Sequence, residues 1–591
     1  MSVAGWKIPG RMGAGGAALG WGGLTLCALL SMVLQWRLYV KLGERALCYA
    51  DWAGFSEAVA RPVPGGVLQW GADFLAVLFH VPWLGGAVFL ALGAGVTLLA
   101  HRWARLPMAV AWLPWLQVLL QVTYCGFSVW IFENAAFPQA YLLEWAAALL
   151  VLGALKRFGA WGFFGVVLYP FLGLGVLIGL FGGALTGGRN GWFRLGCVAV
   201  AVAAFGLSKW GCYADPSWMN LLKTQWCLLY DEGALAWNLL SVLVMGIVFG
   251  AEALETWAKR LINVARMRPW MPAVLILGFA VTGICFCDPP GALYAILRCE
   301  ANLRRGDGQA ATVLPEEQIV NHRMLSAYYI HGLWRAGQLE HRLFDVAWKV
   351  SHKTSTIDTM SLDGHWLLYH YGIVQLARRW CYESVIKLGW NAEHYALLAK
   401  IALVCNEMPL AERYARQLKR IPLRGKEAET LLAYARGERV PEGDELRRVA
   451  ELHLRLCADN GSPTFENSKK LEESIYNRYA VLKNGSREMV TLYLCASLLL
   501  QETSVFLENY DVILNVWPER PLPRVFQQAL LAAASQVPPD QQPPLTASLF
   551  TPGMLEAFAA FQKVAPTVHP AEEAFRNRFG KSFWYYASFL Q

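Results

Sequence analysis

The chain has 591 residues, a net charge of +8 and a marked imbalance in where its charges lie. Residues 1–287 contain 18 Lys/Arg and 11 Asp/Glu, whereas residues 288–591 contain 34 and 33. The length exceeds what one hydrophobic core supports, so we expect a transmembrane domain at 1–287 and a soluble domain at 288–591. The excess positive charge flanks apolar runs, which argues against nucleic acid as a partner, because that needs a basic stripe on a soluble face.

Long apolar runs in the first domain predict about eight membrane spans, because about 20 apolar residues are needed to cross a bilayer. Nineteen of the 26 Trp precede residue 288, as expected of side chains at a membrane interface. Two further apolar stretches, 65–79 and 218–230, contain more polar residues than the candidate spans, and we interpret them as interfacial or re-entrant helices. The candidate spans are 17–39, 83–100, 106–122, 139–155, 160–181, 192–207, 234–249 and 271–287.

Four positive charges within ten residues predict the orientation: Lys259, Arg260, Arg266 and Arg268. The positive-inside rule places this cluster in the cytoplasm together with the N-terminus, provided that one weak segment between 158 and 258 does not cross. The last span then runs outward. We therefore expect a multi-pass protein of the bacterial inner membrane, with membrane lipids as partners and with residues 288–591 outside the cytoplasm.

Acidic residues near one membrane face suggest an enzymatic alternative. Glu44 and Asp51 lie in the first loop, which this topology places outside the cytoplasm, and Asp73 follows shortly after it. Multi-span glycosyltransferases that use polyprenyl-phosphate sugars carry acids in the same loop, where a carboxylate binds a divalent metal or acts as a base. These three residues are the candidate catalytic residues of such an enzyme, and a divalent metal is expected only in that case. Loop acids are more often simply solvated.

Four acidic residues inside or beside the predicted spans are further functional candidates, because carboxylates are costly within a bilayer. Of these, Glu144 lies deepest in its apolar run. No series of acids at helical spacing indicates an ion pathway, so a transporter is not favoured. The four residues are Asp73, Glu133, Glu144 and Glu252.

From residue 316 onward, short amphipathic segments and tight turns predict helices, and no alternating pattern indicates strands. We therefore predict an all-α protein. Consecutive hairpins of roughly 30 residues are typical of an α-solenoid, here of degenerate tetratricopeptide-like type, although an irregular helical domain remains the alternative. The predicted helices are 318–335, 338–350, 366–379, 382–388, 392–405, 410–419, 487–500, 505–515, 524–535 and 570–590.

The clearest repeat lies between residues 392 and 422. Ala399 and Ala402 are one turn apart, and small side chains there let a second helix pack closely. The turn is predicted at Asn406-Glu407, and the sequence after Gly337 resembles it. The aromatic segment 579–589 at the end of the chain is predicted to form a cap on the preceding hairpin.

Metal and redox sites are not predicted. Six of the 11 His lie between residues 322 and 370, but only His365 and His370 approach zinc-ligand spacing, and five residues is a poor spacing for one helical face. The five Cys of the second domain have no paired spacing, so they are interpreted as buried apolar residues.

Several sequence features together resemble a known family. Pro64-Gly65-Gly66 precedes Asp73-Phe74-Leu75 and the turn Pro82-Trp83-Leu84-Gly85, and the second domain contains Arg524-Val525-Phe526-Gln527-Gln528-Ala529-Leu530 and Phe583-Trp584-Tyr585-Tyr586. The chain resembles domain-of-unknown-function family 6057, found in bacteroidete-type membrane proteins. The resemblance implies an envelope protein with several spans and a tetratricopeptide-like C-terminal region, and it implies no catalytic residue.

The leading functional hypothesis is therefore non-enzymatic. The transmembrane domain would anchor a helical-repeat domain that binds a protein or peptide partner at the bacterial envelope, without a cofactor. The alternative is the glycosyltransferase, with the repeats recruiting its acceptor.

Overall fold

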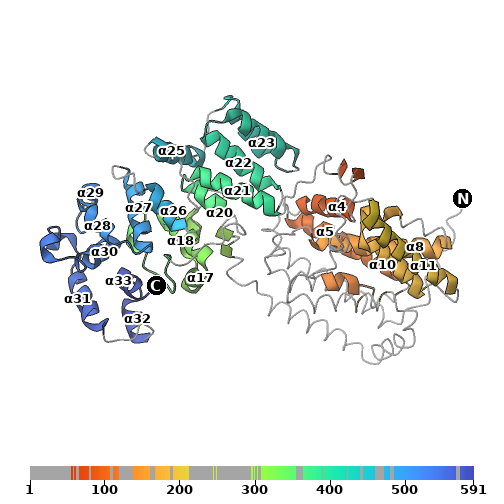
Figure 1. The fold of residues 1–591 in the computed structure, drawn as a ribbon, viewed down its shortest axis with the longest axis horizontal. Helices are drawn as coiled ribbons and strands as arrows, with labels where there is room; N and C mark the ends of the chain where they lie inside the picture. Colours follow the sequence, from red (N-terminus) through yellow and green to blue (C-terminus); the bar gives the residue numbers. More distant parts are fainter. Residues whose placement is uncertain are drawn as a thin grey trace. The chain divides into compact units, whose positions relative to one another are not determined.

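The computed structural model is all-helical in the residues that it describes, which confirms the all-α prediction (Figure 1). Contacts divide the structure into two compact units, and we describe each by itself. The first comprises Met1–Pro290, Trp390–Glu393 and Lys419–Lys426, and the second comprises the rest of the chain. The described residues are 55–56, 59–60, 65–78, 82–104, 106, 111–118, 137–159, 167–186, 191–211, 244, 248, 295–296, 298–299, 302–303, 308–353, 364–388, 390–421, 423–439, 444–458, 471–479, 485–566 and 573–590.

In the first unit, one helix, α8, packs against three others. It contacts α4, α5 and α10, and α10 in turn packs against α11. α5 and α8 both carry basic residues in their last turn, where a positive charge complements the helix dipole. The helices are α4 (Gly66–Val77), α5 (Pro82–Trp103), α8 (Phe137–Phe158), α9 (Tyr169–Leu172), α10 (Leu174–Thr186) and α11 (Gly191–Gly211).

Glycines make the contact between α8 and α10 unusually close. Gly175, Gly179 and Gly183 are four residues apart and therefore share one face of α10. A Cβ atom on Gly179 would lie 2.5 Å from the carbonyl oxygen of Ala148, and one on Gly175 would lie 2.7 Å from that of Glu144. Both distances are shorter than van der Waals contact. Glycine at these positions therefore allows the two backbones to approach, a device common in apolar helix pairs.

One described helix, Leu84–Trp103, is long and apolar enough to cross a membrane. Two shorter apolar helices, Leu174–Leu185 and Leu195–Ala204, accompany it. Length and composition alone do not distinguish a membrane span from the core helix of a soluble protein, so the multi-span bundle stays a prediction.

The predicted spans agree with the structure only in part. Segments 83–100, 139–155 and 192–207 lie within α5, α8 and α11. The predicted span 160–181 is not one helix, because Gly173 adopts a positive φ of 66° between α9 and α10. Segments 17–39 and 271–287 lie outside the described residues, and 106–122 and 234–249 are described only in part.

The second unit consists of short helices around a continuous apolar core. Residues of α18 and α20 are buried all round, as are nearly all those of α27 and α30. The helices are α17 (Glu316–Asn321), α18 (Arg323–Arg335), α19 (Leu339–Arg342), α20 (Gly364–His370), α21 (Val374–Leu388), α22 (Ala392–Val404), α23 (Met408–Arg420), α24 (Gly425–Ala435), α25 (Asp444–Ala458), α26 (Leu471–Tyr479), α27 (Arg487–Leu499), α28 (Ser504–Glu508), α29 (Tyr510–Val516), α30 (Arg524–Ala534), α31 (Met554–Val564), α32 (Glu573–Phe579) and α33 (Phe583–Phe589), with 3₁₀ turns at Gly308–Val313, Pro539–Gln541 and Ala547–Leu549.

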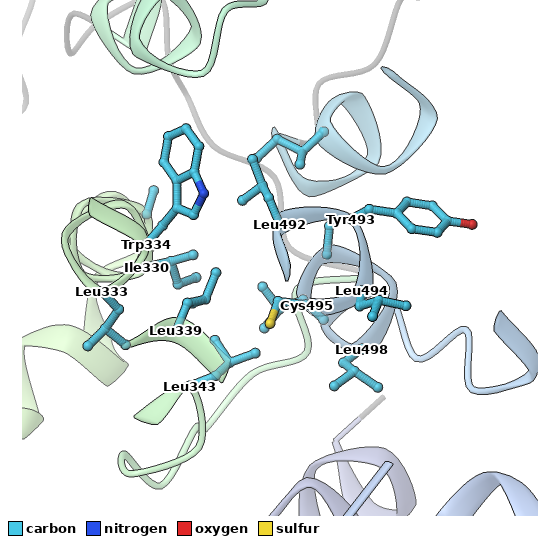
Figure 2. Packing of buried hydrophobic residues seen from close by; sticks show 14 of the residues in the cluster. Ile330, Leu333, Trp334, Leu339, Leu343, Leu492, Tyr493, Leu494, Cys495 and Leu498 are labelled. Carbon is cyan, nitrogen blue, oxygen red and sulfur yellow. The ribbon is translucent and has the colours of Figure 1, made fainter. Parts of the chain in front are cut away.

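Figure 2 shows the apolar contact between α18–α19 and α27. Ile330 and Leu333 of α18 lie beside Leu339 and Leu343 of the α19 segment, and α27 supplies the opposing side chains. Leu333, Leu339 and Leu343 are completely buried. Each such side chain contributes about 1.5–3 kcal/mol through burial, so this contact holds together segments about 150 residues apart.

Five helices of the second unit end in the same turn. One residue takes the left-handed conformation directly after α18, α20, α22, α24 and α27. The backbone N–H of the next residue then donates a hydrogen bond to the carbonyl oxygen five residues earlier. This bond provides a partner for one of the backbone carbonyls that have none within the helix at its C-terminal end. These bonds are Gln338–Leu333 (2.8 Å), Ile373–Leu368 (3.0 Å), Glu407–Ala402 (2.8 Å), Glu438–Ala433 (2.9 Å) and Glu502–Ser497 (2.9 Å). The left-handed residues are numbered 337, 372, 406, 437 and 501, so the intervals are 35, 34, 31 and 64 residues.

These turns confirm some predicted helix ends and correct others. The turn at Asn406-Glu407 and its counterpart at Gly337 lie where the sequence predicts them. The predicted helix 366–379 is wrong, because Gly372 ends α20 with a φ of 74° and α21 continues through the predicted break near residue 380. The predicted helix 318–335 is also interrupted, at His322, whose backbone is extended.

The C-terminal helices form the predicted aromatic cap. The ring centroid of Phe561 on α31 lies 5.4 Å from that of Phe579 and 5.9 Å from that of Trp584. The indole Nε1 of Trp584 donates to the backbone oxygen of Gln528 on α30, at 2.9 Å. The aromatic side chains of α32 and α33 therefore close the end of the core.

Candidate functional site

The three predicted catalytic acids are described only in part. Asp73 lies on α4, half-buried, and its Oδ1 accepts a hydrogen bond from Nε2 of Gln69 one turn earlier, at 2.9 Å. Glu44 and Asp51 lie outside the described residues. The glycosyltransferase therefore stays a prediction.

The buried carboxylate Glu144 lies on α8, where the side chain is only 2% exposed. Its backbone oxygen faces the glycine stripe of α10. Of the other acids predicted in or beside the spans, Glu133 and Glu252 lie outside the described residues.

The two His with near-zinc spacing contact different neighbours. His365 and His370 both lie buried on α20. The ring of His365 is 5.8 Å from that of His394, whereas the ring of His370 is 5.7 Å from that of His331. In the described segments no three His, Cys, Asp or Glu side chains lie close enough together to hold a metal ion.

A cluster of aromatic and imidazole rings lies where α18, α20 and α25 meet. The ring of Tyr371 is 5.1 Å from His331 and 5.0 Å from Trp334, between centroids. His370 contacts both His331 and Trp366, the latter at 6.1 Å. These five residues, His331, Trp334, Trp366, His370 and Tyr371, form what we call the aromatic–histidine cluster.

Burial keeps the interior of this cluster uncharged. It lowers the pKa of His331 well below the usual 6.5, and the nearby His370 and Arg448 lower it further. Burial raises the pKa of Tyr371. Nδ1 of His370 lies 2.7 Å from Oε1 of Glu445. Burial lowers the pKa of His370 to about 3 and raises the pKa of the Glu445 carboxyl group, so in both residues it favours the neutral form.

Charged side chains cover the cluster. Nζ of Lys400 lies 5.0 Å from the ring centroid of Trp366, and the guanidinium of Arg448 lies 4.5 Å from that of Trp334. Such contacts contribute about 0.5–2 kcal/mol each. Arg448 also forms an ion pair with the exposed Glu488. We call Lys400, Glu445, Arg448 and Glu488 the charged rim.

The rim and the cluster together form a partly exposed surface that carries both basic and acidic side chains. Arg and Trp dominate the binding energy of protein interfaces, and here the arginine is held in place by an indole beneath it.

The sequence indicated the histidines of this site but not the charged residues that cover them. The concentration of His between residues 322 and 370 is visible in the sequence, but its partners Lys400, Glu445 and Arg448 follow 30 to 78 residues after His370. No local spacing signals that they meet.

Comparison with known proteins gives one match. The model of a family of unknown function, DUF6057, matches residues 19–590. No curated protein and no solved structure matches the chain.

Proposed function

Since the chain belongs to the DUF6057 family, a family of unknown function, we propose its role from its own residues. It is a multi-span protein of the bacterial envelope whose second unit is an α-solenoid that binds a protein or peptide partner. The protein acts as an anchored binding module rather than as an enzyme.

The recurrent turn is the observation that carries this proposal. Four left-handed turns at intervals of 35, 34 and 31 residues, and a fifth after about two more such lengths, indicate one helical hairpin per interval. The interval approximates the 34 residues of a tetratricopeptide repeat. Stacked hairpins of this kind present a continuous surface, and extended segments of partner proteins bind there.

The charged rim is the surface that we propose for the partner. It combines side chains of α22, α25 and the start of α27, and it lies over two indoles. Glu488 is the exposed rim residue, and the other three are partly buried.

The membrane part of the proposal rests on the apolar first half. α5 provides one helix of sufficient length, and the glycine contact between α8 and α10 is of the kind found between membrane helices. Reporter fusions after Arg268 and after Gln591 test the orientation. A phosphatase reporter active only at Gln591 supports an extracytoplasmic solenoid, and the reverse pattern contradicts it.

Site-specific photocrosslinking in native membranes tests partner binding. A crosslinking amino acid replaces Glu488, the exposed rim residue on α27, in one variant and Leu555, which is exposed on α31, in a control variant. We expect a defined adduct from position 488 and none from 555. The proposal would be contradicted if both variants yield only the uncrosslinked protein while a known membrane complex is captured in parallel.

A further inference from the structure

A thiol and an imidazole face one another at a second place in the helical hairpins. Sγ of Cys405, in the turn after α22, lies 3.8 Å from Nε2 of His453 on α25. The amide Nε2 of Gln375, on α21, donates toward the same sulfur at 3.5 Å. Three helices therefore meet at one thiol, although 48 residues separate Cys405 from His453.

The backbone beside this pair orients the imidazole. Burial, the largest influence, lowers the pKa of His453, while a hydrogen bond with the backbone of Gly372 opposes this and Arg378 and Arg478 lower it further. A backbone group that favours the protonated ring is a carbonyl that accepts a ring N–H. Because its pKa is lowered, the ring is neutral near pH 7, and one of its two nitrogens is then an acceptor.

Gly372 makes this contact possible. It adopts a φ of 74° in the turn between α20 and α21, and a Cβ atom there would lie 2.8 Å from Cβ of Leu452 and 3.4 Å from the backbone nitrogen of His453. Only a residue without a side chain lets α25 come this close. The same turn that ends α20 thus places His453 beside Cys405.

Cys405 also differs from the other described cysteines in exposure and charge environment. Cys197, Cys299, Cys381 and Cys495 are buried, whereas Cys405 is partly exposed. The guanidinium of Arg378 interacts electrostatically with Cys405 and is itself held by Glu407. A cation beside a partly exposed thiol favours the thiolate, which is the nucleophilic form.

We propose that Cys405 is a reactive thiol that exchanges with low-molecular-weight disulfides, with His453 as its base. Nε2 of His453 takes the thiol proton, and the thiolate attacks one sulfur of the disulfide R–S–S–R. The Cys405–S–S–R bond forms as the original S–S bond breaks. The departing sulfur takes the proton from His453 and leaves as R–SH, so the disulfide is the only oxidant required. This chemistry is independent of the partner binding proposed above.

The test uses the full-length protein in detergent and glutathione disulfide as the probe. Trypsin releases residues 401–413, in which Cys405 is the one cysteine, so mass spectrometry follows the adduct at this site alone. A synthetic 401–413 peptide provides the same thiol without His453. At pH 7 a free thiol is only a few per cent ionised, so we expect Cys405 in the protein to react about 10-fold faster than in the peptide.

Two variants and a pH profile separate the proposal from a structural effect. We expect His453→Gln to lower the rate to that of the peptide or below, and His322→Gln, which removes an exposed imidazole elsewhere, to leave it unchanged. The ratio of the reaction rate of Cys405 in the unmodified protein to that in the peptide should fall as the pH rises above 9, because the peptide thiol is then ionised without a base. A protein rate no higher than the peptide rate at pH 7 would overturn the proposal, as would an undiminished rate in the His453 variant.

Discussion

The indole Nε1 of Trp517 donates a hydrogen bond to Oε1 of Glu340, 3.1 Å away and 177 residues earlier in the chain. Two further donors reach the same carboxylate: Nη2 of Arg487 at 2.8 Å and Oγ1 of Thr491 at 2.8 Å. The side chain of Glu340 is only 7% exposed. One buried carboxylate therefore connects α19, α27 and the end of α29.

Replacing Glu340 with Gln is expected to destabilise the second unit. The substitution keeps the shape of the side chain but removes its charge and part of its accepting capacity, which leaves buried donors unsatisfied. We expect the free energy of unfolding to fall by about 2–3 kcal/mol, measured by denaturant unfolding in detergent. Glu451→Gln, which breaks an exposed pair with Arg447, should cost less than about 0.5 kcal/mol. Equal losses in the two variants would contradict the role of Glu340.

Gly372 and Gly437 provide a matched pair for the recurrent turn. Both have left-handed φ values, 74° and 70°, but a side chain on Gly437 meets no atom within 4 Å, whereas one on Gly372 meets Leu452 at 2.8 Å. Gly437→Ala should therefore cost only the backbone strain, about 1 kcal/mol. Gly372→Ala should lower the free energy of unfolding by at least about twice as much, which thermal unfolding measures as a larger fall in the midpoint temperature. Equal shifts in the midpoint temperature would show that α25 does not depend on this close approach.

The second unit is expected to lose stability in acid. Burial lowers the pKa of His331 and of His352 well below 6.5, the ordinary value that the unfolded chain retains. The contribution of these two histidines to the free energy of unfolding is complete above about pH 7. It is lost as the pH falls below 6.5, because there the unfolded chain binds protons at these residues and the folded protein does not. Each contributes a slope of up to about 1.4 kcal/mol per pH unit. The double variant His331→Gln, His352→Gln should show a flatter stability profile between pH 6.5 and 5, and an unchanged slope would contradict the assignment.

The contact between α8 and α10 is expected to depend on its glycines. Gly179→Val places methyl groups where even a Cβ atom would lie 2.5 Å from the carbonyl oxygen of Ala148, so the helices must separate. Gly95→Val on α5 is the control, because nothing lies within 4 Å of its Cβ position. We expect the first variant to lower the thermal midpoint in detergent by several degrees and the second to leave it nearly unchanged. Similar thermal midpoints for the two variants would mean that the contact between α8 and α10 contributes little to stability.

Much of the local structure follows from the sequence alone. The contrast in charge between the halves, the absence of strand patterning and the turns at Gly337 and Asn406 depend on composition and on neighbouring residues, and short-range physics determines them. The error at residues 366–379 arises where a long-range contact matters. Gly372 lies within an apparently continuous helical pattern, and its left-handed conformation is stabilised by the packing of α25 against it.

The functional surfaces depend on tertiary structure. His331 meets His370 and Cys405 meets His453, although the residues of these pairs are 39 and 48 positions apart in the chain. Sequence spacing shows which side chains share a helix face, but it does not show which faces of separate helices meet. That choice is made by the burial of apolar side chains such as Leu333, Leu339 and Leu452 in one common core, a force that acts without regard to sequence separation.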